Sequence, residues 1–389
     1  MRRSRWNVEI ESGMVIYVLY YVTIAFLYIF IERYKFCFYP NVEFATDRRN
    51  SEKRQIAFFL VVASSLLIMI LGFRSEYNGR DLHNSLGTGY FYFYDIINED
   101  SFLEILQNFG KKKYANFEIG FVLFCKFIGT LCSNHQIMLF ASALVSVVPV
   151  GYYIYKNSKN PWLSMMVYTV LPFFGPAYFS AIRQGIAIGF VVFSYELTKR
   201  KKLISFILII LLASTFHSSV IVVLVAYPLY HFRMDRKSLM IGGLVILGCV
   251  FLLRIPLFIL LARIVDEDAQ MTVSSAVNLF LLLTLLYVVC VAFKKRQDDN
   301  MRGSLNLFWL ACAAQSFSGI SNMAGRVAWY FMPVLVILIP NLIEDMQIQE
   351  KVLRKPVAWL IGIFAAMLGL YILRTDTIAQ AYPYVPFWK

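Results

Sequence analysis

Residues 181–230 read AIRQGIAIGFVVFSYELTKRKKLISFILIILLASTFHSSVIVVLVAYPLY, with apolar runs on either side of a basic turn at 199–202. Arg183 precedes Arg200 by seventeen positions, and His217 follows it by seventeen. If the basic turn joins two membrane helices, the equal rise per residue brings Arg183 and His217 to about the same depth. Ionisable side chains are costly inside a membrane protein, so function is the default hypothesis for this pair.

The composition indicates a polytopic membrane protein. Of 389 residues, 59% are hydrophobic and 16% are charged, against roughly 25% charged in soluble domains, and the mean hydropathy is +0.61. The net charge of +13 is the excess expected of cytoplasmic loops that obey the positive-inside rule. No loop interleaves basic and aromatic residues as a nucleic-acid-binding surface does, so we expect no nucleic-acid partner.

About twelve apolar segments approach the roughly 17–25 residues that a helix needs to cross a bilayer. They are 14–31, 56–73, 137–155, 162–179, 181–197, 203–216, 218–232, 239–253, 275–293, 305–320, 326–340 and 357–373. The first has no small-residue cleavage site and is expected to be a retained helix. We therefore predict an all-α integral membrane protein, a polytopic bundle of about 12 transmembrane helices forming a single transmembrane domain over 1–389.

Basic clusters predict the orientation of the chain. They occur at 48–54, 156–159, 199–202, 233–237, 294–296 and 351–355. If all of them face the cytoplasm, the segments between them pair into outward-pointing hairpins, and Arg183, His217 and Arg326 lie at the outer face. Residues 74–117 then form one long outer loop, in which the tyrosines at 90, 92 and 94 and the stretch 102–109 predict an amphipathic surface helix or, alternatively, a glycan platform.

Segment 118–131 cannot then be a simple crossing, because the segments before and after it must both meet the outer face. Its 14 residues span only about 21 Å as a helix. We predict a re-entrant or half-membrane element that enters from the outer face. Such backbone is tolerated only where it is buried in protein or lines a cavity.

Residues 203–230 form one nearly continuous apolar stretch of 28. As a single helix, it would separate the basic clusters at 199–202 and 233–237 onto opposite faces of the membrane. As a hairpin turning at His217, each arm is shorter than a normal span. We expect the hairpin, with His217 recessed below the outer membrane surface, where a lipid head group can reach it.

Arg183 and His217 are the leading catalytic candidates. An arginine fork near a helix N-terminus is a good ligand for phosphate, and Gln184 beside it adds a polar group; the alternative is an arginine that snorkels from a helix end. His217 suits a general base near neutral pH or a phosphate hydrogen-bond donor. The alternative for His217 is a histidine whose hydrogen bonds are satisfied by Ser218 and Ser219.

Other polar residues at the predicted outer face join the candidates. Arg326 precedes Tyr330 by four positions, which puts both on one face of a helix, as a second cation for an anionic head group or as an interfacial anchor. Arg74 and Asp81 follow the second segment, either with functional roles or as a structural ion pair. Glu118 opens the re-entrant element and is a candidate base, sugar ligand or partner of an arginine.

No metal or cofactor is expected. The chain lacks a P-loop, a Rossmann glycine pattern, HExxH and GxSxG. Asp266 and Asp268 have the spacing of a DxD pair but lie in a charged loop and are interpreted as solvated surface. The cysteines show no CxxC pair and no Cys/His metal spacing, and are interpreted as small packing residues: Cys37, Cys125, Cys132, Cys249, Cys290 and Cys312.

Several short motifs occur together in a recognisable order. They are Phe73-Arg74 with Gly79-Arg80-Asp81, Glu118-Ile119-Gly120-Phe121, Ile182-Arg183-Gln184, Phe216-His217-Ser218-Ser219, Arg326 with Tyr330-Phe331, and Tyr382-Pro383-Tyr384. In this order the chain resembles the EpsG family, which is grouped with the Wzy-type polysaccharide polymerases of bacteria. It departs from the family at Gly79-Arg80-Asp81, where the usual motif is Gly-Thr-Asp, and at Ser85, where a tyrosine is usual.

The resemblance implies a GT-C-like glycosyltransferase in the bacterial inner (cytoplasmic) membrane, with its active site facing the periplasm or cell exterior. The implied substrate is an undecaprenyl-diphosphate-linked oligosaccharide repeat unit, polymerised into capsule, exopolysaccharide or O-antigen with undecaprenyl diphosphate as leaving group. Fixed cations stabilise such a leaving group, so Arg183, Arg326 and Arg74 are its candidate ligands.

The attacking hydroxyl needs a base, for which His217, Asp81 and Glu118 are candidates. Gln184, Tyr330 and Ser218 are further substrate-binding candidates. Expected partners are membrane lipid and a flippase and chain-length regulator of the same pathway. Two other functions stay open: a flippase or transporter of lipid-linked glycans, which needs a polar path through the bundle, and a membrane O-acyltransferase, which draws a cytoplasmic donor.

Overall fold

The structure, a computed structural model, describes residues 2–33, 45–83, 89–109, 113–114, 117–233, 235–265, 277–293, 299–345 and 351–388. Within these ranges the regular structure is helical, apart from one isolated β-bridge between Arg74 and Pro386. The α-helices are α1 (Arg2–Arg33), α2 (Ala45–Gly72), α3 (Tyr90–Glu99), α4 (Phe102–Asn108), α5 (Ile119–Leu131), α6 (Gln136–Asn157), α7 (Pro161–Val170), α8 (Ile182–Lys199), α9 (Leu203–Ser214), α10 (Ala226–His231), α11 (Gly243–Val265), α12 (Val277–Phe293), α13 (Asp299–Gln315), α14 (Asn322–Gly325), α15 (Leu335–Asp345) and α16 (Lys351–Thr375). The π-helical segments are η2 (Pro176–Ser180) and η4 (Ser238–Gly242), and the 3₁₀ segments are η3 (Ser218–Val225), η5 (Ser316–Gly319), η6 (Arg326–Tyr330) and η7 (Met332–Val334).

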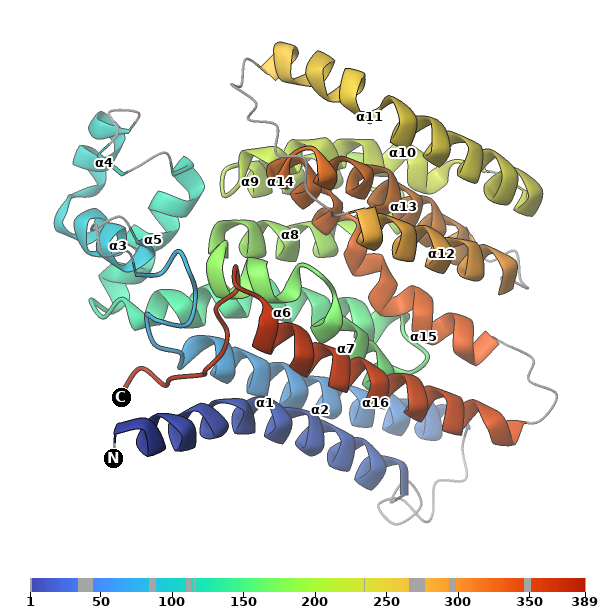
Figure 1. Cartoon of the computed structure of the whole chain (residues 1–389), viewed down its shortest axis with the longest axis horizontal. Helices are drawn as coiled ribbons and strands as arrows, with labels where there is room; N and C mark the ends of the chain where they lie inside the picture. The colour runs from blue at the N-terminus through green and yellow to red at the C-terminus, as the bar shows by residue number, and fades with distance from the viewer. Residues whose placement is uncertain are drawn as a thin grey trace.

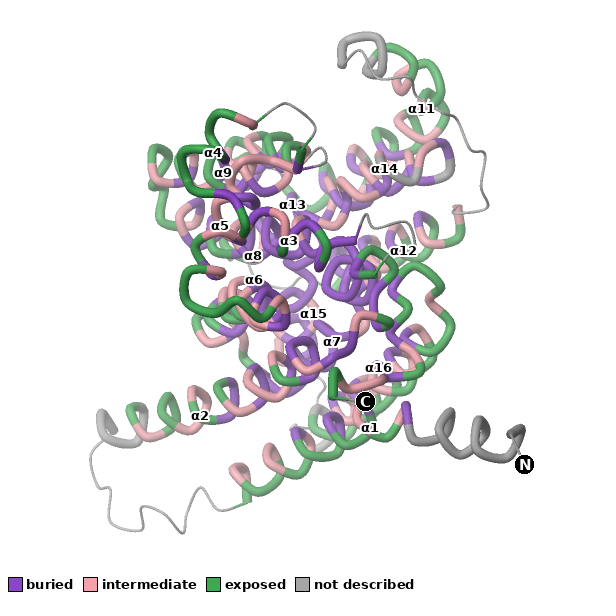
Figure 2. Tube along the Cα trace, turned by 90° about the vertical axis from the view of Figure 1, so that its left-hand side faces the viewer, coloured by how far each residue is buried: buried purple, intermediate pink, exposed green. Residues whose placement is uncertain are grey.

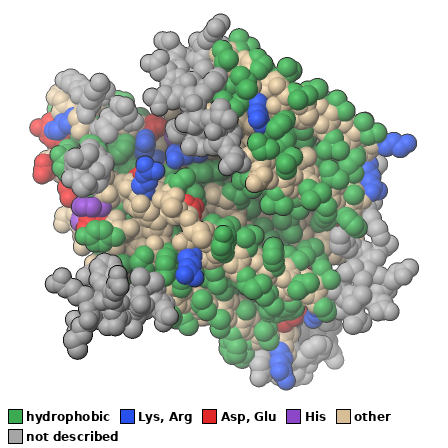
Figure 3. All heavy atoms as spheres, viewed as in Figure 1, with side chains coloured by type: hydrophobic (Ala, Val, Ile, Leu, Met, Phe, Trp, Pro, Cys, Tyr) green, Lys and Arg blue, Asp and Glu red, His purple; other side chains and the backbone are tan. Residues whose placement is uncertain are grey.

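The long helices run side by side as a bundle, and α3, α4 and α5 gather at one end of it (Figure 1). The C-terminal tail finishes at the same end, which we call the α3–α5 end. Seen from that end, buried residues concentrate in the middle of the bundle and exposed residues lie around it (Figure 2). Hydrophobic side chains cover most of the flank shown in Figure 3.

Six helices in the described ranges are long and apolar enough to cross a membrane: Gly13–Arg33, Asn50–Gly72, Gln136–Asn157, Ser238–Leu260, Arg326–Asp345 and Lys355–Thr375. Large apolar side chains point outward from them, and Leu19, Leu252 and Leu360 are 57%, 79% and 70% exposed. So extensive an exposed apolar surface suits lipid rather than water. The helical membrane fold is therefore confirmed, while the expected number of about 12 crossings and the GT-C-like architecture stay predictions.

One predicted span is interrupted. The sequence predicts a continuous helix over 162–179, but α7 ends at Val170, and η2 follows after a turn. Leu171 has φ −61° and ψ 140°, because the ring of Pro172 disfavours helical backbone in the residue before it. After this break the chain turns back, and α8 begins at Ile182 with Arg183 in its first turn.

The hairpin expected over 203–230 is confirmed. The first arm is α9, the second is η3 with α10, and His217 lies between them. Nε2 of His231 lies 3.0 Å from the carbonyl oxygen of Thr198, so the second arm returns to the level at which the first began. The rings of Phe206 and Tyr227 pack between the arms, 5.4 Å apart.

Lysines mark the opposite end of the bundle. Lys159 pairs with Asp345, joining the start of α7 to the end of α15, and Nζ of Lys199 donates to Oδ1 of Asn157 at 2.6 Å, joining α8 to α6. We call this the lysine end. Since α8 begins beside α3–α5 and finishes here, Arg183 and Lys199 lie at opposite ends of the molecule.

The tail after α16 folds across the segment that follows α2. The side chain of Asn78 binds the tail with both of its polar atoms. Nδ2 donates to the carbonyl of Pro383 at 2.8 Å, and Oδ1 accepts from the N–H of Val385 at 2.7 Å. The next residue, Gly79, has φ +137°, and a Cβ there would lie 2.0 Å from the carbonyl oxygen of Phe179, so only glycine fits this turn.

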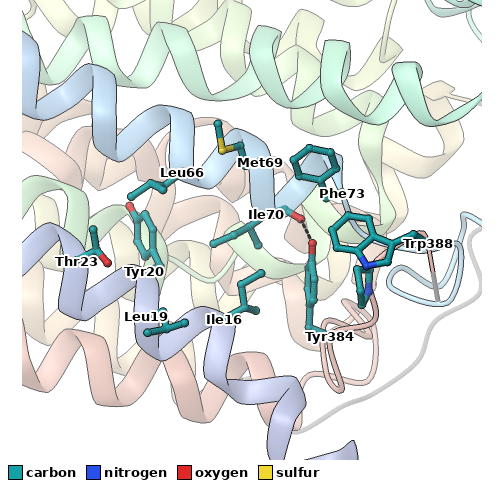
Figure 4. Close-up of a pocket in the computed structure, with 11 residues that line it drawn as sticks. Ile16, Leu19, Tyr20, Thr23, Leu66, Met69, Ile70, Phe73, Tyr384 and Trp388 are labelled. Carbon is teal, nitrogen blue, oxygen red and sulfur yellow. Dashed lines mark hydrogen bonds between the residues drawn. The ribbon is translucent and has the colours of Figure 1, made fainter.

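The tail also closes an apolar cavity of about 420 Å³ against α1 and α2. Figure 4 shows the indole of Trp388 and the ring of Tyr384 at one side of this cavity, with Tyr384 hydrogen-bonded to the backbone of Ile70. The Tyr384 hydroxyl donates to that carbonyl at 3.0 Å. The tail is thus an integral part of the α3–α5 end.

Candidate functional site

Three ionisable side chains meet at the α3–α5 end of the bundle. Oε2 of Glu118 pairs with Nη1 of Arg183, and Oε1 of Glu118 lies 3.3 Å from Nδ1 of His217. All three side chains are largely buried, with exposed fractions of 18%, 23% and 16%. We call them the Glu118 triad. The predicted juxtaposition of Arg183 and His217 is thus observed, and Glu118 is the group that joins them.

Local packing explains how Glu118 reaches the hairpin turn. It is the residue before α5, and the second residue of that helix, Gly120, donates its N–H to the carbonyl of Thr215 at 2.8 Å. A Cβ at Gly120 would lie 2.1 Å from Oγ1 of Thr215, so the absent side chain permits the close approach. The N–H of Ser218 then donates to Oε1 of Glu118 at 2.9 Å.

Two aromatic residues that the sequence did not single out for this role hold Arg183. Its Nε donates to the hydroxyl of Tyr90 at 3.3 Å, and its guanidinium lies 4.6 Å from the ring centroid of Phe117. Tyr90 and Phe117 stack on each other at 5.4 Å. Among the described residues, Nη2 of Arg183 has no hydrogen-bond partner, so that end of the fork can bind an anionic ligand. The tyrosine-rich patch at 90–94 was the available signal for Tyr90.

The triad keeps Glu118 ionised. Burial would raise the pKa of its carboxyl, but the hydrogen bond from His217, the charge of Arg183 and the N–H of Ser218 outweigh burial and lower the pKa to about 2. An ionised carboxylate next to Nδ1 favours the proton on that nitrogen and orients the imidazole ring. Nε2 of His217 then has its lone pair available, and no described residue occupies it. This arrangement suits a general base.

A second set of contacts joins the elements that surround the triad. Nε2 of Gln184 donates to the carbonyl of Arg326 at 3.1 Å, and the hydroxyls of Tyr330 and Ser219 lie 2.8 Å apart. Tyr330 is fully buried. Gln184 and Tyr330 therefore tie α8, η6 and the hairpin turn together around the triad.

Arg326 and Tyr330 do not lie on the α-helix that the sequence predicts for them. Residues 326–330 form a 3₁₀ segment rather than an α-helix, and in a 3₁₀ helix the side chain three positions on is the one aligned. The guanidinium of Arg326 accordingly lies 5.5 Å from the ring centroid of Trp329. The backbone carbonyl of Arg326 accepts from Gln184, and the hydroxyl of Tyr330 lies against that of Ser219.

Arg74 lies outside the triad. It is 1% exposed, and its Nη1 and Nη2 donate to the carbonyls of Leu71 at 2.5 Å and Tyr178 at 2.8 Å. It forms no ion pair with Asp81 in the described part of the chain, because these carbonyls hold it while the Asp81 side chain is exposed. The structural pair considered for these two residues is therefore not observed, and Arg74 instead joins the end of α2 to η2.

Asp81 and Ser218 border the site through their backbones. The carbonyl of Asp81 accepts from the N–H of Tyr90 at 3.0 Å, which places the first outer loop beside the residue that holds Arg183. Ser218 contributes its backbone N–H to Oε1 of Glu118. Over the described residues no cluster of three His, Cys, Asp or Glu side chains is arranged to hold a metal; Cys37, Ser85, Asp266 and Asp268 lie outside the described residues.

Comparison with known proteins assigns the chain to a family without supplying a structural template. The profile of the EpsG family matches residues 56–385, a range that contains every residue of the triad and its supporting contacts. No curated protein and no solved structure matches the chain.

Proposed function

The chain belongs to the EpsG family of Wzy-type, polymerase-like membrane proteins of polysaccharide biosynthesis, and from this premise we propose that it polymerises lipid-linked oligosaccharide repeat units. The substrate is a repeat unit on undecaprenyl diphosphate in the outer leaflet of the bacterial inner membrane. The product is a surface polysaccharide: capsule, exopolysaccharide or O-antigen. The observation that carries the proposal is the Glu118 triad, a cation and an oriented histidine held on one carboxylate.

The reaction is a glycosyl transfer without a nucleotide sugar. A hydroxyl oxygen of one lipid-linked repeat attacks the anomeric carbon of the growing chain, forming the new glycosidic bond. The bond from that carbon to the diphosphate oxygen breaks, and undecaprenyl diphosphate leaves with the bonding electron pair. Nε2 of His217 receives the proton of the attacking hydroxyl.

Arg183 stabilises the negative charge that develops on the diphosphate, through the Nη2 group that no described residue occupies. Glu118 is a positioning residue in this mechanism, since both of its oxygens are engaged with Arg183, His217 and the N–H of Ser218. Arg326 is the second candidate cation. Asp81, exposed beside Tyr90, is the alternative base.

Gln184, Tyr330 and Ser218 are assigned to shaping the substrate site, and Arg74 to holding the end of α2 against η2. The protein works in the membrane beside a flippase that supplies repeat units and a regulator of chain length. Its active site faces the periplasm or cell exterior, because the Glu118 triad lies at the end opposite the lysines, which the positive-inside rule assigns to the cytoplasm.

The deciding experiment is the glycan length profile of cells that lack this protein, compared on a gel with the same cells complemented. Collapse of a ladder to a single repeat unit, restored by complementation, is the expected result. Loss of all surface repeats with accumulation of lipid-linked repeats on the cytoplasmic side would identify a flippase instead. An unchanged ladder with altered glycan mass would identify a modifying enzyme such as an O-acyltransferase.

A further inference from the structure

A polar cavity of about 220 Å³ lies at the lysine end, between α6, α8, α10, α13 and α15. One water needs about 10–15 Å³ of such space, so this cavity has room for a small ligand group. It lies at the end opposite the Glu118 triad and has no part in the proposed polymerase reaction. Lys156, Lys159, Lys199, Asn157, Asn341 and Tyr195 are among the residues that line it.

The charge of the cavity is unbalanced in favour of cations. Its lining contains three ammonium groups and one carboxylate, that of Asp345, which pairs with Lys159. Lys199 donates to an amide oxygen, Oδ1 of Asn157, at 2.6 Å. Nζ of Lys156 lies 5.5 Å and 5.4 Å from the ring centroids of Tyr152 and Tyr155. Within the described ranges, neither Lys156 nor Lys199 has a carboxylate partner.

The nearby buried carboxylate, that of Glu196, forms no ion pair with these two lysines in the described ranges. Glu196 has a side chain only 6% exposed, pairs with Arg200 at 3.8 Å and accepts a hydrogen bond from Nδ2 of Asn157. Asn157 therefore uses its amide N–H on Glu196 and its amide oxygen on Lys199. This division leaves the other two ammonium hydrogens of Lys199 available for a ligand.

We propose that this cavity binds the phosphate group of an anionic ligand through Lys156 and Lys199. Lysine is a common phosphate ligand, and basic pockets between membrane helices on the cytoplasmic side bind the head groups of anionic lipids. The exposed position of Lys156 lets a ligand approach from the membrane surface or from solution. The phosphate belongs either to a lipid head group of the adjacent leaflet or to a soluble phosphate ester.

Thermal unfolding of the full-length protein in neutral detergent tests the proposal. The probes are phosphatidylglycerol, phosphatidylcholine and glycerol 3-phosphate, each added over a range of concentrations. We expect the melting temperature to rise with phosphatidylglycerol and not with phosphatidylcholine. A rise with glycerol 3-phosphate at similar concentration would identify a soluble ester as the source of the phosphate, and no rise with it would identify the lipid.

The variant K156Q/K199Q should bind the effective probe at least about tenfold more weakly, because each charge-assisted hydrogen bond contributes more than a factor of ten. The matched control is K201Q/K202Q, which removes the same charge from two exposed lysines of the neighbouring turn that do not line the cavity. The control should respond like the wild type. K156R/K199R keeps both charges and should retain binding, which separates loss of the site from loss of folding.

An equal response of the wild type and K156Q/K199Q would overturn the proposal. So would an equal loss in the K201Q/K202Q control, since that would show a surface-charge effect without a site. A wild type that no probe stabilises would overturn it as well. None of these results depends on polymerase activity, so the proposed function and this inference fail separately.

Discussion

Glu118 holds two side chains at once, and its two oxygens have different partners. Oε2 faces the guanidinium of Arg183, while Oε1 faces Nδ1 of His217 and the N–H of Ser218. Removing the carboxylate therefore releases the cation and the base together. In the proposed reaction, this predicts that changes at Glu118 and His217 are not additive, because the histidine depends on the carboxylate for its orientation.

The first prediction concerns the triad. H217N and E118Q should each lower the rate of chain extension by about 10²–10⁴-fold, the range typical for loss of an acid–base group. The double variant should be little worse than H217N. The measurement is the rate of polymer formation in membrane vesicles, normalised to protein level.

The control for this prediction is a second carboxylate–histidine pair, Glu76 with His83, whose atoms lie 3.0 Å apart and whose side chains are 36% and 48% exposed. E76Q makes the same carboxylate-to-amide change outside the triad, and this variant should extend chains at the wild-type rate. If H217N makes full-length polymer at that rate, His217 is not the catalytic base.

The second prediction follows from the pKa of Glu118, which is lowered from its ordinary value of 4.5 to about 2. A depressed carboxyl pKa stabilises the folded state fully above the unfolded value, and this contribution is lost as the pH falls towards the folded value. The wild type and E118Q should therefore differ in melting temperature by an amount that is fully present above about pH 5 and narrows as the pH falls below that value. A difference that stays unchanged as the pH falls from about 5 to about 3 would contradict the lowered pKa of Glu118.

The third prediction is that the reaction needs no metal. Arginine supplies the positive charge that a divalent ion would otherwise bring to a diphosphate leaving group. Chain extension in vesicles should therefore be insensitive to EDTA. Activity abolished by EDTA and restored by a divalent cation would show that Arg183 does not replace the metal.

Sequence reasoning brought Arg183 and His217 together because both distances run along helices of constant rise from one turn. The same reasoning did not single out Phe117 or assign Tyr90 to Arg183. Tyr90 lies 93 positions from Arg183, and only the packing of α3 and α5 against the start of α8 brings them together. Contacts of this kind depend on tertiary packing, which periodicity does not encode.

At the scale of elements, proline and 3₁₀ geometry caused the main departures from the predicted helices. Hydropathy alone predicts one span over 162–179, whereas α7 ends at Val170, just before Pro172. Hydropathy also does not distinguish an α-helix from the 3₁₀ segment that contains Arg326. The hairpin at His217 was predictable, because its two arms had to be reconciled with two basic clusters on one face.

The fourth prediction concerns the docking of the tail on the segment after α2. Asn78 is 1% exposed and binds the backbone at Pro383 and Val385. N78A leaves buried backbone groups without partners, which costs about 1–3 kcal/mol for each group that stays unsatisfied. The variant should unfold at a lower temperature, and a protease should remove a C-terminal tag from it faster.

N50A is the matched control, since Asn50 is an exposed asparagine near the start of α2. It should leave both the melting temperature and the cleavage rate unchanged. Wild-type stability and cleavage in N78A would show that the contacts of Asn78 contribute little to holding the tail.

At the scale of the whole molecule, the triad and the lysine cavity define two opposite ends joined by α8. The fifth prediction is therefore one of opposite accessibility. In a cysteine-free background, S218C should react with a membrane-impermeant thiol reagent from outside the cell. K201C, at the exposed basic turn, should react only after the membrane is opened. The reverse pattern would invert the proposed orientation of the active site.

The docking of the tail also sets an order of events during biosynthesis. The N–H of Ser75 donates to the carbonyl of Val385 at 2.8 Å, and Asn78 binds Pro383, 305 positions further along the chain. Since synthesis runs from the N-terminus, the segment after α2 has no tail to bind until the ribosome has made all the intervening helices. The tail must then be delivered to the same side of the membrane as that segment. The α3–α5 end, and the turn at Gly79 beside it, is thus finished late in synthesis, so a nascent protein completes its bundle before this end closes.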